Sequence, residues 1–443
     1  MEAIDVIRDL VTDEVRHGRF SVSRRIFTDE EVFEREITQI FEGGWVYLAH
    51  ESQLPNTNDF LTTTIGRKSI LLTRTASGAL QAFLNACPHR GTALTRSERG
   101  NARVFVCPYH GWSFNPEGRN VHLKDHDTGG YTATFEQTSH DLRPLGRVEL
   151  YRGFVFGSVS PEVPALSEHL GAAAAFIDLV VDQSPDGLEV IGGSTTYRYR
   201  GNWKMQVENG VDGYHFTTVH QNYLRVLKQR SVRAQQSGVP EQLRSGFNSQ
   251  TWRPESGWYD LGHGHTVLWL VSTAPTDRPL WEQRDALTAR VGPTRTKWML
   301  NRQRNLALFP NVQLMDQNST QIRVIRPIAP DLTEVKSYCF GPRGESAPAR
   351  ERRIRQFEDF FNASGLATPD DLAVFEAMQV GCITDPSATQ GYDRGLQRMQ
   401  SGADDEARAL GIEPAANGSD SNDELHYHGM YRQWAYMMAK EVK

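Results

Sequence analysis

Two cysteine–histidine pairs constrain the fold of this 443-residue chain more than any other feature of its sequence. Cys87 and His89 form the first pair; seventeen residues later Cys107 and His110 form the second, which a Gly-Trp dipeptide follows. Each pair comes directly after a β-type run, so each offers one thiolate and one imidazole from a loop at a strand end. Short β-type runs separated by turn signals lie at residues 60–65, 69–74, 80–86, 103–106 and 153–159. They predict a compact antiparallel β domain over about residues 40–160.

The donor types of the two pairs suit a metal centre. In a reducing compartment cysteines stay as thiols, so those close to histidines are better metal ligands than disulfide partners. A Cys₂His₂ set can hold Zn²⁺, although zinc sites usually take both cysteines from one knuckle. The alternating Cys-His order favours a [2Fe–2S] cluster with sulfur ligands on one iron and nitrogen ligands on the other. Zinc, or four unrelated residues in β loops, are the alternatives.

A second group of ligand-type residues lies at Asp212, His215 and His220. Asp212 and His215 are three apart and would share a face if residues 202–215 are helical. His220 follows five residues after His215, so a re-turned segment could aim both imidazoles at one point. Two neutral imidazoles and a distant carboxylate are the ligand set of non-haem Fe(II) oxygenases. From spacing alone, ordinary half-buried histidines are the commoner explanation. Lys204 and Glu208 are expected to form a buried or interfacial polar pair.

With these motifs in view, the chain resembles the large (α) subunit of Rieske-type aromatic-ring-hydroxylating oxygenases over nearly its whole length. Besides the cysteine–histidine motif, the matching residues are Asn202-Trp203-Lys204, Glu208-Asn209, Asp212, Tyr214-His215 and His220. Within that family the sequence is most similar to the benzoate, halobenzoate and anthranilate 1,2-dioxygenase branch, at residues 40–42, 48–52 and 360–365.

The resemblance implies an α+β fold in which an antiparallel β Rieske domain is inserted before a larger α+β catalytic domain. The catalytic domain should have a mostly antiparallel sheet flanked by helices. We expect N-terminal helices at 1–39 that pack on the catalytic domain, the Rieske [2Fe–2S] domain at 40–160 and the mononuclear iron domain at 161–443.

The resemblance also implies roles for individual residues. Cluster ligands would be Cys87, His89, Cys107 and His110, and iron ligands would be His215, His220 and Asp371. Asp212 resembles the acid that joins His215 to a cluster histidine, His110, of a neighbouring subunit, and Asn209 matches a polar residue close to the iron. By proximity to the ligands, we expect Val207, Phe216 and Val219 in the wall of the substrate pocket.

The choice of Asp371 as third iron ligand depends on the resemblance, because the residues alone favour another explanation. Thr368 could cap a helix, Pro369 could occupy its first turn, and two acids would favour its positive end. The family takes its carboxylate from the second acid of a similar pair, which makes Asp371 the first choice and Asp370 its near-equal rival.

The function implied is that of a terminal oxygenase subunit that adds both atoms of O₂ to benzoate or a substituted benzoate, giving a cis-dihydrodiol. Electrons would come from NADH through a separate reductase, because the chain shows no dinucleotide-binding glycine motif. The resemblance implies an α₃ or α₃β₃ assembly with a small β subunit. Gln221 and residues 381–394 depart from benzoate-type relatives, so anthranilate, salicylate or another aryl acid, and monooxygenation, stay open as alternatives. No arginine or lysine can be assigned to the substrate carboxylate.

Two alternatives come from other classes of protein. A Rieske electron-transfer protein would have no use for the iron ligands, and a zinc-stabilised binding module would lack a reducible cluster. The net charge of −6 and the lack of a long basic run argue against nucleic acid or an anionic membrane as partner. No stretch approaches 18 apolar residues, and the first residues lack the apolar core of a signal peptide, so we expect a cytoplasmic protein.

Overall fold

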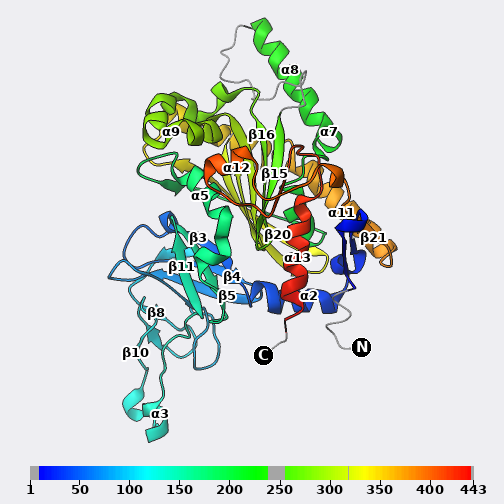
Figure 1. Ribbon diagram of the computed structural model, residues 1–443. Helices are drawn as coiled ribbons and strands as arrows, with labels where there is room; N and C mark the ends of the chain where they lie inside the picture. The colour runs from blue at the N-terminus through cyan, green and yellow to red at the C-terminus, as the bar shows by residue number, and fades with distance from the viewer. Residues whose placement is uncertain (1–8, 238–254, 318, 441–443) are drawn as a thin grey trace. The chain divides into compact units, whose positions relative to one another are not determined.

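The computed structural model describes residues 9–237, 255–317 and 319–440. The chain divides into two compact units, one formed by Phe41–Leu166 and the other by Met1–Ile40 together with Ser167–Lys443. Figure 1 shows both units, with the β-rich first unit in blue to cyan. Within the described residues, no helix combines the length and the apolar character needed to cross a membrane.

The unit Phe41–Leu166 is built from three small antiparallel sheets. Their orders are β6-β5-β4-β7, β10-β9-β8 and β11-β12-β3. The strands are β3 Val46–His50, β4 Asp59–Ile65, β5 Lys68–Arg74, β6 Leu80–Leu84, β7 Arg99–Asn101, β8 Phe105–Val106, β9 Ser113–Phe114, β10 Asn120–His122, β11 Arg147–Tyr151 and β12 Phe154–Ser158, with one short helix, α3 Ala133–Gln137. The compact antiparallel β structure expected around the two cysteine–histidine pairs is therefore present.

The larger unit is organised around a ten-stranded antiparallel sheet. Its order is β13-β20-β19-β18-β17-β16-β15-β23-β22, and β14 also pairs with β20. The strands are β13 Leu188–Val190, β14 Thr195–Tyr199, β15 Ser256–Gly262, β16 His265–Val271, β17 Arg302–Leu308, β18 Val312–Asp316, β19 Thr320–Ala329, β20 Leu332–Pro342, β22 Gln400–Ser401 and β23 Ala416–Gly418. Every residue of β17 and β18 is buried, because other elements cover both faces at the centre of this sheet.

Helices flank this sheet, as Figure 1 shows for α9 and α13. Helix α13 packs against β15 and β16, α9 against β17, α10 against β19 and β20, and α6 against β19. The helices are α2 Glu30–Glu36, α4 Leu166–Leu170, α5 Ala174–Val181, α6 Trp203–Asn209, α7 Phe216–Val219, α8 Gln221–Ser237, α9 Arg284–Leu300, α10 Ala347–Phe360, α11 Thr368–Thr384, α12 Asp405–Leu410 and α13 His426–Met438. The mixture of helices with antiparallel sheets is the predicted α+β class.

The N-terminal segment contributes strands as well as helices. Besides α2 and the π-helical turn η3 Ile37–Phe41, it forms the strands β1 Val11–Glu14 and β2 Arg19–Ser23. The two strands pair with each other, and β2 also pairs with β21 Thr389–Gly391. The expectation of helices alone at 1–39 was therefore incomplete. Short polar runs such as Val11–Glu14 carry little strand signal of their own and are ordered here by their pairing partners.

A buried polar network fixes α6, the helix that leads into the site. Glu36 on α2 is fully buried and accepts hydrogen bonds from the indole nitrogens of Trp203 at 2.8 Å and Trp434 at 2.6 Å. Its other contact is the Lys204 ammonium, 2.5 Å away and also fully buried. Each charge in this group has a partner, which is the condition for burying it. The network joins α2, α6 and α13.

Candidate metal centres

The two cysteine–histidine pairs lie in loops of matching geometry. The carbonyl of Cys87 accepts a hydrogen bond from the Gly91 amide at 2.8 Å, and that of Cys107 accepts one from the Gly111 amide at 3.0 Å. Both glycines have a φ of 73°, a left-handed conformation that glycine adopts without strain. The first loop follows β6 in one sheet, and the second joins the paired strands β8 and β9 of another.

These loops bring the four predicted cluster ligands together. Both thiols are buried, and burial raises the pKa of Cys87, as does its neighbour Cys107. The rings of His89 and His110 are 4.6 Å apart, and His89 stacks on Trp112 at 4.7 Å. Two adjacent buried sulfurs with two adjacent imidazoles nearer the surface fit a [2Fe–2S] cluster with sulfur and nitrogen ligands on different irons.

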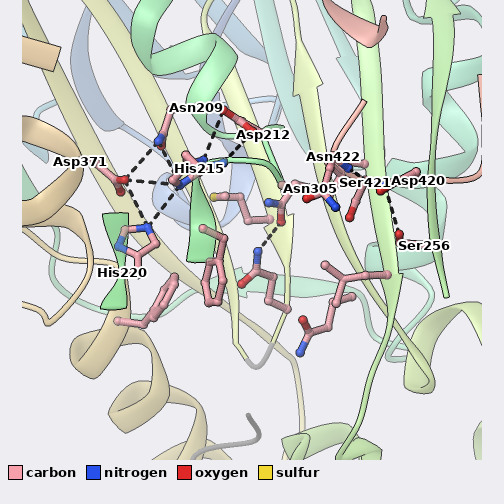
Figure 2. A pocket seen from close by; sticks show the side chains of 18 of the residues that line it. Asn209, Asp212, His215, His220, Ser256, Asn305, Asp371, Asp420, Ser421 and Asn422 are labelled. Carbon is pink, nitrogen blue, oxygen red and sulfur yellow. Dashed lines mark hydrogen bonds and ion pairs between the residues drawn. The ribbon is translucent and has the colours of Figure 1, made fainter. Parts of the chain in front are cut away.

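His215, His220 and Asp371 converge on one point in the larger unit (Figure 2). The two Nε2 atoms are 3.2 Å apart, and the Asp371 Oδ1 atom lies 3.5 Å from that of His215 and 3.2 Å from that of His220. Donors about 2.1 Å from a metal ion and about 90° apart stand about 3 Å from each other. Two imidazoles and one carboxylate at this spacing fit an Fe(II) ion held on one face.

The chain reaches this geometry without the continuous helix over residues 202–215. Helix α6 ends at Asn209, and His215 and His220 flank the separate short helix α7. The Gln313 side chain donates to the carbonyls of Gln206 and Val207, the last turn of α6, at 2.8 and 3.1 Å. The amide thus gives a partner to the Val207 carbonyl at the helix end and a second partner to the Gln206 carbonyl, which also accepts from the Gly210 amide at 3.2 Å. The condition of one helix over residues 202–215 is therefore not met.

Asp212 approaches His215 through a turn. Its Oδ1 atom accepts hydrogen bonds from the amides of Tyr214 at 2.6 Å and His215 at 3.3 Å, and its Oδ2 lies 3.4 Å from His215 Nδ1. Burial opposes the charged form of Asp212, but the hydrogen bond and charge of His215 hold its pKa below the ordinary value. Burial likewise opposes the imidazolium of His215, yet Asp212 raises its pKa. A carboxylate at Nδ1 leaves Nε2 as the ligand atom.

The acid pair at the start of α11 is divided between two atoms of one imidazole. Asp371 Oδ1 faces the Nε2 atoms, whereas Asp370 Oδ2 lies 3.9 Å from His220 Nδ1. Consecutive helical residues point about 100° apart, which separates the two carboxylates. Ala367, not Thr368, is the N-cap residue, and no side chain caps this helix. The buried Thr368 hydroxyl has no hydrogen-bond partner, so Thr368 does not cap this helix. Pro369 and the two acids do lie in its first turn, as the sequence suggested.

A cavity of about 550 Å³ opens beside the converging donors. Of the three residues expected in its wall, Phe216 lines it, whereas Val207 and Val219 do not. On α6, Val207 points about 200° away from Asn209, which does line the cavity. The sequence did not single out its other walls, which come largely from the sheet and α10 and include Leu268, Leu270, Met315, Arg323, Phe360 and Phe361.

Asn209 lies beside the convergent donors. Its Nδ2 atom donates to Asp371 Oδ1 at 3.1 Å and stands 3.3 Å from His215 Nε2. Lys204, in contrast, pairs with Glu36 rather than with Glu208. The Glu208 carboxylate instead accepts hydrogen bonds from the hydroxyls of Tyr392, at 2.9 Å, and Tyr431.

Comparison with known proteins agrees with the two kinds of metal centre. Residues 188–440 match the family model "Ring hydroxylating alpha subunit (catalytic domain)", and residues 44–136 match "Rieske [2Fe-2S] domain". This pair of domains defines the class as the large subunit of a Rieske-type terminal oxygenase. The chain belongs to the ring-hydroxylating dioxygenase α subunits, as its sequence predicted.

Individual relatives cover nearly the whole chain. Toluate 1,2-dioxygenase subunit alpha of Pseudomonas putida is 43% identical, over 99% of this chain and 96% of its own length. The 2-halobenzoate 1,2-dioxygenase large subunit of Burkholderia cepacia is 42% identical, over 99% of this chain and 94% of its own length. The anthranilate 1,2-dioxygenase large subunit of Acinetobacter baylyi is 42% identical, over 94% of this chain and 89% of its own length. A naphthalene 1,2-dioxygenase structure with indole in its active site matches with a TM-score of 0.80 and 25% identity. The match covers 95% of this chain and 92% of that structure's chain.

Proposed function

We propose that this chain is the α subunit of an oxygenase that cis-dihydroxylates benzoate or a substituted benzoate. The observation that carries the proposal is the convergence of His215, His220 and Asp371 at the edge of a cavity that has an aromatic and aliphatic part, formed by Phe216, Leu268, Leu270, Met315, Phe360 and Phe361, within an otherwise polar lining. The relatives at 42–43% identity are named for toluate, halobenzoate and anthranilate, which are all aromatic acids. A cavity of about 550 Å³ is within the range of small-molecule sites.

Each residue near the donors has a distinct task in this proposal. His215, His220 and Asp371 hold one face of the mononuclear iron, which supplies O₂ activation when bound. Asp212 holds a proton on His215 Nδ1, so that the lone pair of Nε2 points at the metal position. Asn209 donates to Asp371 Oδ1 and thereby fixes the orientation of that carboxylate. Cys87, His89, Cys107 and His110 would hold the [2Fe–2S] cluster.

The proposal includes a source of electrons and an assembly. A separate reductase would carry electrons from NADH to the cluster, and the α subunits would form α₃ or α₃β₃ with a small β subunit. Asp212 would join His215 to His110 of a neighbouring subunit, and its side chain is 27% exposed, which leaves room for a further contact. A cytoplasmic location agrees with cysteines that are assigned as cluster ligands, Cys87 and Cys107, or are buried thiols, Cys339 and Cys382.

Metal analysis and product analysis of the purified holoenzyme test this function. We expect about three irons per chain, two of them in a reducible Rieske cluster. With a compatible reductase, NADH and ¹⁸O₂, a panel of aryl acids should give cis-diols that carry two ¹⁸O atoms. Turnover of neutral arenes without any aryl acid would reject the substrate class. Two irons without oxygenase activity would indicate an electron-transfer protein, and zinc with no cluster would indicate a binding module.

A further inference from the structure

The cavity beside the iron ligands contains a buried arginine without a counter-charge. Arg323 on β19 is only 3% exposed and lines the cavity. Among the described residues it has no ion pair and no hydrogen bond, and its Nε atom is buried without an acceptor. Its recorded contact is with the ring of Phe361, whose centroid is 5.6 Å from the guanidinium carbon. An unpaired buried charge is costly, so this guanidinium is suited to a ligand that brings an anion.

The other buried arginines show how unusual Arg323 is in this chain. Five arginines of the described residues are at most 3% exposed, and every one except Arg323 has a carboxylate partner. The pairs are Arg278 with Asp316, Arg304 with Asp316, Arg302 with Glu406 and Arg353 with Glu345. The protein therefore compensates its buried guanidinium groups wherever they are structural.

The two remaining arginines of the cavity wall are already engaged. Arg398 forms ion pairs with Asp420 and Asp423. Arg394 donates to the carbonyl of Asn422 at 2.8 Å and lies 3.9 Å from the centroid of the Tyr214 ring. Arg394 is exposed, so within the described cavity wall Arg323 is the buried cation without a counter-charge.

Strand register places the Arg323 side chain on the face of the sheet that is turned toward α6 and the iron ligands beyond it. Arg323 lies directly opposite Gln313 on β18, and such cross-strand partners project to the same face. Gln313 donates to the last turn of α6, the helix that leads to the ligands. Aromatic rings lie between Arg323 and the iron ligands. The ring centroids of Phe361 and Phe360 are 4.5 Å apart, and those of Phe360 and His220 are 6.0 Å apart.

We propose that Arg323 binds the carboxylate of the aromatic acid and so determines which rings the enzyme accepts. This inference rests on the proposed function and names the residue that selects its substrate class. The planar guanidinium matches a carboxylate with two parallel hydrogen bonds, which restricts the ring to one orientation beside the iron. A neutral arene would leave the charge unpaired, so the same residue discriminates against it.

Two substitutions in the holoenzyme test the anchor, with a control on the same strand. In Arg323→Gln, KM for benzoate should rise about a hundredfold or more, since one partner of a buried charge pair is lost. Turnover of benzamide, a neutral probe of the same shape, should be unchanged or improved. Arg323→Lys keeps the positive charge but loses the planar pair of N–H donors, so its KM for benzoate should lie between those of wild type and Arg323→Gln. Arg326→Gln changes a residue on the opposite face, paired with Glu334 at 3.3 Å, and should leave KM for benzoate unchanged.

A binding measurement that needs no turnover distinguishes a residue that binds the substrate carboxylate from a charge that only stabilises the fold. Benzoate should raise the unfolding temperature of the wild-type holoenzyme and of Arg326→Gln, but not that of Arg323→Gln. Without ligand, Arg323→Gln should be at least as stable as wild type, because it removes an unpaired charge. Its iron content should equal that of wild type.

Several outcomes would overturn the proposal. A wild-type KM for benzoate in Arg323→Gln, an equal loss of benzamide turnover, or loss of iron would each show that Arg323 is not a carboxylate anchor. If Arg323→Gln fails to fold, a wild-type KM for benzoate in Arg323→Lys decides against the anchor. None of these results contradicts the proposed function if the wild-type enzyme converts benzoate. A wild-type enzyme that converts neutral arenes and no aryl acid would instead reject the function itself.

Discussion

The adjacent acids Asp370 and Asp371 have different tasks because they face different atoms of His220. Asp371 Oδ1 lies 3.2 Å from Nε2, the ligand atom, while Asp370 Oδ2 lies 3.9 Å from Nδ1. We expect Asp371→Asn to lose the mononuclear iron and keep the cluster, so that iron falls from about three to about two per chain. Asp370→Asn should keep all its iron and lose about 10–100-fold in activity. Metal analysis with EPR checks both. The reverse pattern would make Asp370 the ligand.

Asp212 is expected to act through His215 rather than on the metal. Asp212→Ala removes the carboxylate 3.4 Å from His215 Nδ1, so we expect an intact cluster spectrum together with loss of turnover. Asp359→Ala, which removes a surface partner of Arg230, is the matched control and should be fully active. EPR of the cluster and NADH-driven turnover are the measurements. Full activity of Asp212→Ala would disprove the bridging role.

Glu208 gives the protein a pH-dependent stability. Burial is the largest influence on this carboxyl and raises its pKa from 4.5 to about 7, against the hydrogen bonds from Tyr431 and Tyr392. The folded state therefore prefers the protonated acid. This contribution is complete below about pH 4.5 and is lost as the pH rises through about 7, a difference of about 3 kcal/mol.

The variant Glu208→Gln isolates this contribution, because its amide does not titrate. Relative to wild type, its unfolding temperature should rise progressively between pH 5 and pH 8. Thermal unfolding at several pH values measures this difference. A difference that does not change with pH would show that Glu208 has an ordinary pKa.

At the scale of elements, helix α6 depends on a buried charge pair formed across the sequence. Glu36→Ala would leave the Lys204 ammonium buried without its partner 2.5 Å away, and we expect a loss of about 3–5 kcal/mol. Asp13→Ala breaks a half-exposed pair with Arg432 and should cost less than about 1 kcal/mol. Thermal unfolding compares the two variants. Equal effects would show that the buried pair does not stabilise α6.

The sequence predicted the elements that local patterns determine. The expected strands at 60–65 and 69–74 are present as β4 Asp59–Ile65 and β5 Lys68–Arg74. Strands β22 and β23 were missed, since they are two and three residues long and exist through pairing with each other and, for β23, with β15. Short, polar, glycine-containing segments carry no period from which a strand can be predicted.

Long-range partners explain what the sequence could not predict at the site. Lys204 and Glu208 are four apart on one helix, which suggested a pair, but the partner of Lys204 is Glu36, 168 residues away. The sequence did not single out Arg323, because the lack of a counter-charge becomes visible only when the surrounding chain is in place. The cysteine–histidine motif was different, since its spacing and loop chemistry are local.

At the scale of the whole molecule, the two sets of donors belong to different compact units. Cys87, His89, Cys107 and His110 lie within Phe41–Leu166, whereas His215, His220 and Asp371 lie in the other unit. In the proposed function, electrons must therefore pass from one unit to the other, either within a chain or between neighbouring chains. The proposed contact of Asp212 with His110 of a neighbouring subunit requires the second route.

Mixed assemblies distinguish the two routes. Cys107→Ser removes a cluster ligand and Asp371→Asn an iron ligand, so assemblies of either variant alone should be inactive. If electrons pass between neighbours in a closed ring, unfolding and reassembling the two variants together in equal amounts should restore about a quarter of wild-type activity, because each working site needs an intact iron site and a neighbour with an intact cluster. Turnover after reconstitution measures this, with separately reassembled variants as the control. Mixed assemblies that stay inactive, while wild type regains activity by the same procedure, would place the electron path within one chain.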